Sequence, residues 1–257
     1  MDGVIVVFSA MLGLAIGSFL NVVIWRVPRK ESVVRPPSHC PQCETPISPK
    51  DNVPLLSWLL LSGKCRHCKN PIPLRYPLVE AGCGVLFLAV AARFGASWEL
   101  PAYLVLTAAL LAISIIDLEH FIVPDRITAP LTVSALALLG LAALAEGNGW
   151  HYGRTLLGGV AYFAFLLFLN ILYPKGMGMG DVKLAFSLGL FLGWLGWGQV
   201  FLGGFLAFLL GALVGVTLIA TKIKSRKDVV PFGPFLALGA MLTILWGDPI
   251  LRWYTGA

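Results

Sequence analysis

The sequence predicts an all-α polytopic membrane protein with about eight transmembrane helices and one polar loop domain. Hydrophobic residues make up 58% of the 257 residues and charged residues only 12%, and the mean hydropathy is +0.83. A soluble domain carries about 25% charged residues. The apolar residues form runs close to the roughly 20 residues that cross a bilayer, and they lack the alternation typical of strands. Helices satisfy their own backbone hydrogen bonds in lipid, so we expect a helix bundle.

The apolar runs define eight predicted spans. The first begins almost at Met1 without a basic leading region and is long enough to cross, so we expect a retained helix and not a signal peptide. The predicted domains are a first transmembrane helix (1–25), a cytoplasmic loop domain (26–76) and a seven-helix membrane domain (77–257). The spans are roughly 4–25, 77–94, 100–117, 128–145, 155–173, 182–197, 199–221 and 229–247.

Positive charge sets the predicted orientation. The loop domain holds nearly half of the Lys and Arg residues, which places it in the cytoplasm by the positive-inside rule. Alternation of the spans then brings three further loops to the same side: 118–127, 174–181 with Lys175, and 222–228 with the basic run KIKSRKD. These cytoplasmic loops account for the net charge of +6, and they can also attract anionic lipid headgroups. We expect no nucleic acid as a partner.

Glycines four residues apart recur inside the spans. Small residues at this spacing let helices approach closely, so we interpret them as packing sites. No internal repeat or low-complexity tract is evident. The pairs are Gly13/Gly17, Gly189/Gly193 and Gly211/Gly215.

Four cysteines in the loop domain form two CxxC pairs, Cys40/Cys43 and Cys65/Cys68, with 21 residues between the pairs. Two such pairs can supply four thiolates to one tetrahedral Zn²⁺, and a loop with little apolar content needs such a staple. The sequence therefore predicts a zinc-stapled cytoplasmic loop domain. A redox dithiol at Cys-Pro-Gln-Cys is the alternative, but it leaves the second pair unexplained and lacks a βαβ context. Cys83, alone in the second span, is interpreted as a small buried apolar residue.

Two aspartates, Asp117 and Asp181, stand at the ends of long apolar runs, where a carboxylate is expensive and therefore a candidate for function. The predicted topology brings both to one membrane face. Adjacent carboxyl groups cannot both ionise easily, so one can act as an acid and the other as a base on water. The pair therefore predicts peptide hydrolysis. Helix capping is an alternative for Asp181, whereas Asp117 lies at a helix C-terminus, where the dipole disfavours an anion.

The residues around the aspartates have simpler interpretations. The glycine-rich run 176–180 follows no strand and fits neither phosphate-binding pattern, so we expect a close-approaching backbone that can admit an extended peptide. Asp125 follows Pro124 and is explained by helix capping. Glu80 lies within the second span, where a carboxylate is usually partnered or functional.

Together these motifs resemble the bacterial type IV prepilin peptidases, the bifunctional leader peptidase/N-methyltransferases of pilus and type II secretion systems. The resemblance implies that Asp117 and Asp181 are the catalytic pair of a GxGD-type aspartic protease, with residues 178–181 as that motif. It also implies that the cysteine loop is the family's N-terminal cytoplasmic domain. The matching segments are GSFLNVVIWRVP (17–28), the stretch from CPQC to LVE (40–80), DLEHFIVPD (117–125) and GMGMGDVK (176–183).

The resemblance implies two successive reactions. The enzyme would cut the short basic leader from prepilins or pseudopilins after a Gly, at the cytoplasmic face of the bacterial inner membrane. It would then methylate the new N-terminal residue with S-adenosyl-L-methionine. No Rossmann fingerprint for this cofactor is present. We assign the methyl donor to Gly17, Ser18, Asn21 and Glu80 together with the zinc loop, although close helix packing accounts for Gly17 and Ser18 almost as well.

The expected partners are the prepilin or pseudopilin substrates, the pilus or type II secretion assembly machinery, and membrane lipid. Two other classes of function remain alternatives. An ion-coupled transporter also combines intramembrane acids with glycine-broken helices, but its acids belong at the bilayer midplane. A membrane-tethered zinc scaffold without chemistry would require the cysteines and not the aspartates.

Overall fold

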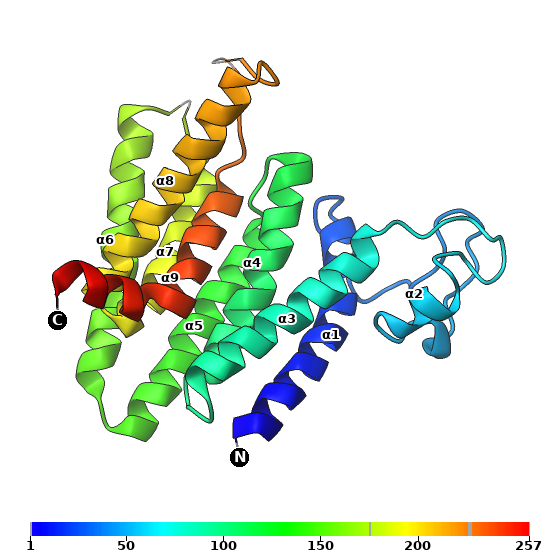
Figure 1. The fold of residues 1–257 in the computed structure, drawn as a ribbon, viewed down its shortest axis with the longest axis horizontal. Helices are drawn as coiled ribbons and strands as arrows, with labels where there is room; N and C mark the ends of the chain where they lie inside the picture. The colour runs from blue at the N-terminus through cyan, green and yellow to red at the C-terminus, as the bar shows by residue number, and fades with distance from the viewer. Residues whose placement is uncertain (1, 175, 226–227, 257) are drawn as a thin grey trace. The chain divides into compact units, whose positions relative to one another are not determined.

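A computed structural model describes residues 2–174, 176–225 and 228–256. Lys175, Arg226 and Lys227, which belong to two of the predicted basic loops, lie outside these residues. The described chain contains eight long helices and no β-strand, and it divides into two compact units, residues 1–100 and 101–257 (Figure 1). The helices of the first unit are α1 (Asp2–Arg26) and α3 (Arg75–Phe94). Those of the second are α4 (Leu100–His120), α5 (Asp125–Glu146), α6 (Gly149–Leu172), α7 (Met179–Leu195), α8 (Trp197–Ala220) and α9 (Gly233–Thr255).

Each of the eight predicted spans corresponds to one long helix, and the predicted all-α polytopic fold class is confirmed. Seven of these helices in the described chain have the length and hydropathy of a membrane span, and the exception is α7. α7 has 17 residues and is therefore about 26 Å long, slightly less than the roughly 30 Å of a hydrocarbon core.

α1 and α3 of the first unit touch through their backbones. A Cβ atom at Gly17 would lie 2.7 Å from the Cα of Glu80, and one at Gly13 would lie 2.8 Å from the carbonyl oxygen of Cys83. Cys83 is fully buried, as expected of a small apolar residue. The packing interpretation of these glycines is confirmed, but it is wrong at Gly215, where no described atom lies within 4 Å of a Cβ position.

The loop between α1 and α3 has almost no core of its own. Besides η1 (Pro49–Asp51) and α2 (Leu56–Leu60), it contains only two isolated bridges. Among residues 28–74 only Cys40, Ser57 and Gly63 are buried. The Arg66 guanidinium donates two hydrogen bonds to the Asp51 carboxylate, at 2.6 and 2.8 Å, and so ties η1 to the second cysteine pair.

The two cysteine pairs belong to equivalent hairpins, residues 40–47 (CPQCETPI) and 65–72 (CRHCKNPI). In each hairpin the first cysteine N–H donates to the carbonyl oxygen five residues later, at 3.0 and 2.9 Å. The residue after each second cysteine, Glu44 or Lys69, has a positive φ, of 55° and 61°. The two hairpins thus form a short repeat of eight residues with four identical positions, which is too short to stand out in the sequence.

α7 is the central helix of the second unit. Twelve of its 17 residues are buried, as expected of a helix that is apolar on all sides. Its contacts with α4, α5 and α6 are the Tyr103 hydroxyl donating to the Phe191 carbonyl oxygen (2.8 Å), the Thr132–Ser187 hydroxyl pair (2.7 Å), and Gly158 packed against Gly189 and Gly193. Its central position places the N-terminus of α7 among the ends of the other helices.

Two helices differ from the predicted spans in ways that affect the site. α4 continues to His120, so Asp117 lies within its last turn and not at its end. α9 covers Gly233–Thr255, whereas the apolar run predicts 229–247. Pro234 occupies the first turn of α9, where its missing N–H has no effect. Asp248 does not end the helix, because the Gln199 side chain donates to its carboxylate at 2.8 Å.

Candidate functional site

Asp117 is buried near the C-terminus of α4, with 4% of its surface exposed. The N–H of Gly233, the first residue of α9, donates to its Oδ2 atom at 2.9 Å. A Cβ atom at residue 233 would lie only 2.7 Å from the same oxygen. The N-terminus of α9 thus supplies the donor and the favourable dipole that the C-terminus of α4 lacks.

Asp181 is the third residue of α7 and is 7% exposed. The N–H of Gly178, which precedes the helix, donates to its Oδ2 atom at 3.2 Å. Its Oδ1 atom is buried and has no hydrogen-bond partner among the described residues. The capping alternative therefore accounts for one carboxylate oxygen only. A buried polar atom without a partner is costly, so the second oxygen requires a proton, a water molecule or a substrate.

The two aspartates lie within electrostatic reach of each other in the second unit. Val123, in the short turn between α4 and α5, adjoins the starts of α7 and α9. It lies 2.9 Å from a Cβ position at Gly180 and 3.4 Å from one at Gly233. Gly180 is thus a position in the glycine-rich run where close approach requires glycine. The turns that follow α4, α6 and α8 lie at one end of this unit (Figure 1). Both acids are within one turn of a helix end, away from the mid-helix position that a transporter requires.

Gly233 was not among the predicted site residues. Its signal in the sequence is Pro231-Phe232-Gly233-Pro234, a glycine between two prolines at the start of an apolar run. The prolines prevent the helix from extending toward the N-terminus of this segment. The N–H of Gly233, at the helix start, therefore has no partner within the helix. Sequence alone does not reveal that this N–H meets a carboxylate 116 residues earlier.

If Asp117 acts in peptide hydrolysis as the sequence predicts, Gly233→Ala is expected to lower kcat/KM for peptide cleavage by about 100-fold, because the new methyl group displaces Asp117 and misplacement of a catalytic group by about 1 Å has effects of that size. The measurement is the rate of peptide cleavage together with the thermal unfolding temperature. Gly215→Ala is the matched control, since a Cβ there meets no atom of the described residues within 4 Å. Normal cleavage by the Gly233 variant would show that the close approach to Asp117 is unimportant.

Asp125 does not cap a helix, and the capping interpretation is wrong. It is the first residue of α5, and the cap residue Pro124 makes no side-chain hydrogen bond. The Lys183 ammonium lies 2.8 and 3.0 Å from the two Asp125 carboxylate oxygens. Lys183 follows Asp181 by two residues, so this ion pair joins the starts of α5 and α7.

A double-mutant cycle of Asp125→Asn and Lys183→Met is expected to give a coupling energy below about 1 kcal/mol, since both side chains are about half exposed or more and solvent screens the pair. The cycle is measured by chemical unfolding at low and high salt. Coupling of several kcal/mol, or coupling insensitive to salt, would contradict this expectation.

The four cysteine Sγ atoms of the loop domain, at positions 40, 43, 65 and 68, lie within 4.8 Å of one another. The Sγ atoms of Cys40 and Cys68 are 3.8 Å apart. A tetrahedral zinc ion with Zn–S bonds of about 2.3 Å separates its sulfur ligands by about 3.8 Å. The donor set and its spacing therefore fit a zinc ion, and the cluster could hold one.

The thiols of the cluster differ in acidity. Hydrogen bonding with the Thr45 hydroxyl and the Thr45 N–H lowers the pKa of Cys43 to about 6. The N–H groups of Cys68 and His67 lower the pKa of Cys65. At Cys68 the Asn70 N–H lowers the pKa, but desolvation and the neighbouring thiols outweigh it and raise the pKa to about 11. A bound metal cation would neutralise the negative charge of the more acidic thiols. It would also favour the thiolate form of all four cysteines, because a metal binds the deprotonated ligand.

The four residues assigned to the methyl donor all lie in the first unit, three on α1 and Glu80 on α3. Gly17 packs against Glu80, whose Oε2 atom accepts the N–H of Leu55 at 2.8 Å. Asn21 is buried beside them and donates to the Tyr76 carbonyl oxygen at 3.2 Å, while its own Oδ1 has no partner among the described residues. Ser18 instead lines a cavity. The structure therefore brings Gly17, Asn21 and Glu80 together and separates Ser18 from them.

Comparison with known proteins identifies the family. Residues 11–94 match the Bacterial Peptidase A24 N-terminal domain, and residues 104–216 match the Type IV leader peptidase family. The chain belongs to the type IV leader peptidase family. It is therefore an enzyme of the peptidase class, and its membrane-capable helices make it a multi-pass membrane member of this family. The first match falls in the unit that carries the cysteines and the second in the unit that carries the aspartates.

Relatives of this leader peptidase family member are similar over nearly their whole length. The chain is 38% identical to a prepilin leader peptidase/N-methyltransferase of Aeromonas hydrophila, covering 95% of this chain and 91% of the relative. Proteins of the same name from Stutzerimonas stutzeri and Pseudomonas aeruginosa are 38% and 37% identical, and each match covers 97% of this chain and 93% of the relative. No solved structure matches the chain at a significant level.

Proposed function

We propose that this chain cleaves the leader peptide of type IV prepilins or pseudopilins and then methylates the new N-terminal residue. The names of its relatives support both activities. The peptidase assignment rests on the two buried aspartates at one end of the second unit. Each has one oxygen held by a glycine N–H, and in the described residues neither has a protein partner for its other oxygen.

Asp117 and Asp181 share one proton in this mechanism, because two neighbouring buried carboxylates cannot both ionise easily. The ionised carboxyl takes a proton from water, and the resulting hydroxide attacks the carbonyl carbon of the leader's Gly at the scissile bond. The protonated carboxyl hydrogen-bonds to the carbonyl oxygen and then returns a proton to the leaving amine as the C–N bond breaks. The two residues titrate as a pair, so neither role belongs to one residue alone.

The glycine N–H groups have a positioning role in this proposal. Gly178 and Gly233 fix the Oδ2 atoms of the two aspartates, which leaves the Oδ1 atoms for water and substrate. Backbone donors of this kind are preorganised and need no rearrangement during the reaction. The positively charged loops at this end of the chain favour the cytoplasmic face of the inner membrane as the site of cleavage. Pilus or type II secretion machinery then receives the product.

Methylation is assigned to the first unit, with S-adenosyl-L-methionine as donor and with Ser18, Gly17, Asn21 and Glu80 as the nearby residues. The cofactor supplies the methyl group for the new N-terminal amine. Among the described residues Asn21 Oδ1 is buried without a partner, and it suits a bound water between α1 and α3. A zinc ion on the four cysteines has a structural role, since a closed set of four thiolates leaves no position for a substrate.

The test is incubation of the purified protein with a synthetic prepilin peptide, with and without S-adenosyl-L-methionine, followed by mass spectrometry. We expect one cut after Gly under both conditions and a mass increase of one methyl group on the product only with the donor. An intact peptide would refute the peptidase assignment, and cleavage without methylation would refute the second activity alone.

A further inference from the structure

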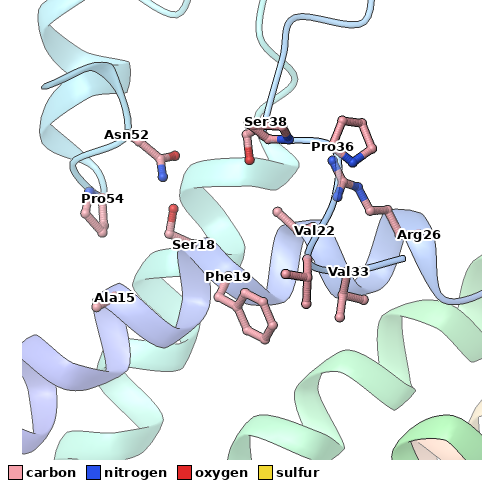
Figure 2. Close-up of a pocket in the computed structure, with 12 residues that line it drawn as sticks. Ala15, Ser18, Phe19, Val22, Arg26, Val33, Pro36, Ser38, Asn52 and Pro54 are labelled. Carbon is pink, nitrogen blue, oxygen red and sulfur yellow. The ribbon is translucent and has the colours of Figure 1, made fainter. Parts of the chain in front are cut away.

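A cavity of about 430 Å³ lies in the first unit, on the side of α1 that carries Ser18 (Figure 2). One wall is α1 itself, through Ser18, Phe19, Val22 and Arg26, and the other is formed by the loop segments 33–38 and 52–54. Gly17 and Asn21 face α3 instead and are not part of it. The volume falls in the range of roughly 300–1,000 Å³ that small-molecule sites occupy.

Arg26 is the charged residue of this cavity. It is only 6% exposed, and its Nη1 atom donates to the Ser32 carbonyl oxygen at 3.0 Å. Among the described residues no carboxylate pairs with it. A guanidinium buried without a counter-ion is costly, and its planar fork suits two hydrogen bonds to a carboxylate or phosphate. The cavity therefore presents one unneutralised cation to whatever occupies it.

The remaining walls are suited to a ligand with polar and apolar parts. Figure 2 shows the Ser18 hydroxyl and the Asn52 amide on the same side of the cavity, with Phe19 and Val33 on the side nearer Arg26. Asn52 can donate and accept hydrogen bonds, and Phe19 can pack against a flat ring. An aliphatic lipid chain would use the apolar wall but not the amide.

We propose that this cavity binds S-adenosyl-L-methionine, with Arg26 holding the α-carboxylate of its methionine part. The inference rests on the methyltransferase activity proposed above and assigns a location to its donor. The Ser18 hydroxyl and the Asn52 amide bind the polar atoms of the nucleoside, and Phe19 packs against the adenine. Of the four residues first assigned to the donor, Ser18 touches it, while Gly17, Asn21 and Glu80 position α1 against α3.

The test measures equilibrium binding of S-adenosylhomocysteine to the full-length protein by calorimetry, because this analogue keeps the carboxylate but has no methyl group to transfer. We expect Arg26→Gln to raise the Kd about 10- to 100-fold, the size of a lost hydrogen bond to a charged group. Ser18→Trp, which fills the cavity and leaves Arg26 in place, is expected to abolish binding. Arg29→Gln is the matched control, since Arg29 is exposed and stacks on the Trp25 ring 3.6 Å away.

Zinc content, measured on every variant, reports whether the loop domain is intact. If Arg26→Gln loses zinc, the Ser18 variant decides the outcome, because no side-chain hydrogen bond joins Ser18 to the loop among the described residues. Wild-type binding with normal binding by both variants would overturn the cavity assignment and leave the proposed methyltransferase intact. Loss of co-purified anionic lipid from the variants with normal binding of the analogue would assign the cavity to a lipid headgroup. A wild-type protein that neither binds the analogue nor methylates would refute the proposed activity itself.

Discussion

Asp117→Asn and Asp181→Asn are each expected to lower the rate of leader cleavage by at least about 10³-fold, because each removes one member of the proposed acid–base pair while preserving its shape. The amide of Asn can still accept the glycine N–H that holds each side chain. The fold should therefore remain, and the unfolding temperature should change little. The measurement is single-turnover cleavage of a prepilin peptide by purified protein.

The double variant gives the sharper test of this expectation. Residues that act as one unit have strongly non-additive effects, so the double variant should be about as slow as either single variant. Glu119→Gln is the matched control: it removes an exposed carboxylate two residues from Asp117 on the same helix. If one Asn variant cleaves normally, the residue concerned has no part in the chemistry. If the rate losses multiply in the double variant, the two aspartates act independently.

If the four cysteines hold zinc as proposed, Cys40→Ser is expected to release the ion and unfold the loop domain. The apparent free energy of zinc binding in small zinc domains is about 10–16 kcal/mol, and the loop has almost no buried apolar core to replace it. Metal analysis should show one zinc per wild-type chain and almost none in the variant. Limited proteolysis should cut the variant between residues 28 and 74, where the wild-type protein resists.

Cys83→Ala is the control for this experiment, because Cys83 is a buried cysteine in α3 that lies outside the cluster. It should keep its zinc and its resistance to proteolysis. Treatment of the wild-type protein with a strong chelator should reproduce the Cys40 variant, since metal removal and ligand removal have the same physical consequence. Purified wild-type protein without any zinc would refute the structural role, and so would a Cys40 variant with stoichiometric zinc.

The helices follow directly from the sequence, because lipid leaves the backbone few other ways to satisfy its hydrogen bonds. Their ends were predicted less well. Hydropathy assigned residues 229–232 to the last span. The helix α9 begins only at Gly233, because Pro231 and Pro234 flank its start. Hydropathy also ended that span at residue 247, whereas α9 continues to Thr255, with the Asp248 carboxylate accepting a hydrogen bond from the Gln199 side chain. Both errors involve single polar or cyclic residues whose effect depends on a neighbour.

The candidate site also contains residues that the sequence indicates and residues that only the structure reveals. Asp117 and Asp181 stood out because charge is rare in this chain, and the cysteines because their spacing suits a metal. Gly233, Arg26 and the Asp125–Lys183 pair did not stand out, since a glycine, a loop-side arginine and a surface ion pair are common in any sequence. Their importance comes from the atoms that they face across the fold.

The sequence by itself determined a helical membrane protein with two rare acids and a four-cysteine loop, because the bilayer and the metal each select for residue type and spacing along the chain. Tertiary structure alone decided that the short helix α7 is central, that the start of α9 holds Asp117, and that a buried arginine lines a cavity beside α1. These features depend on contacts between residues far apart in the chain. Such contacts are fixed by packing, and residue type in one segment does not record which distant segment will meet it.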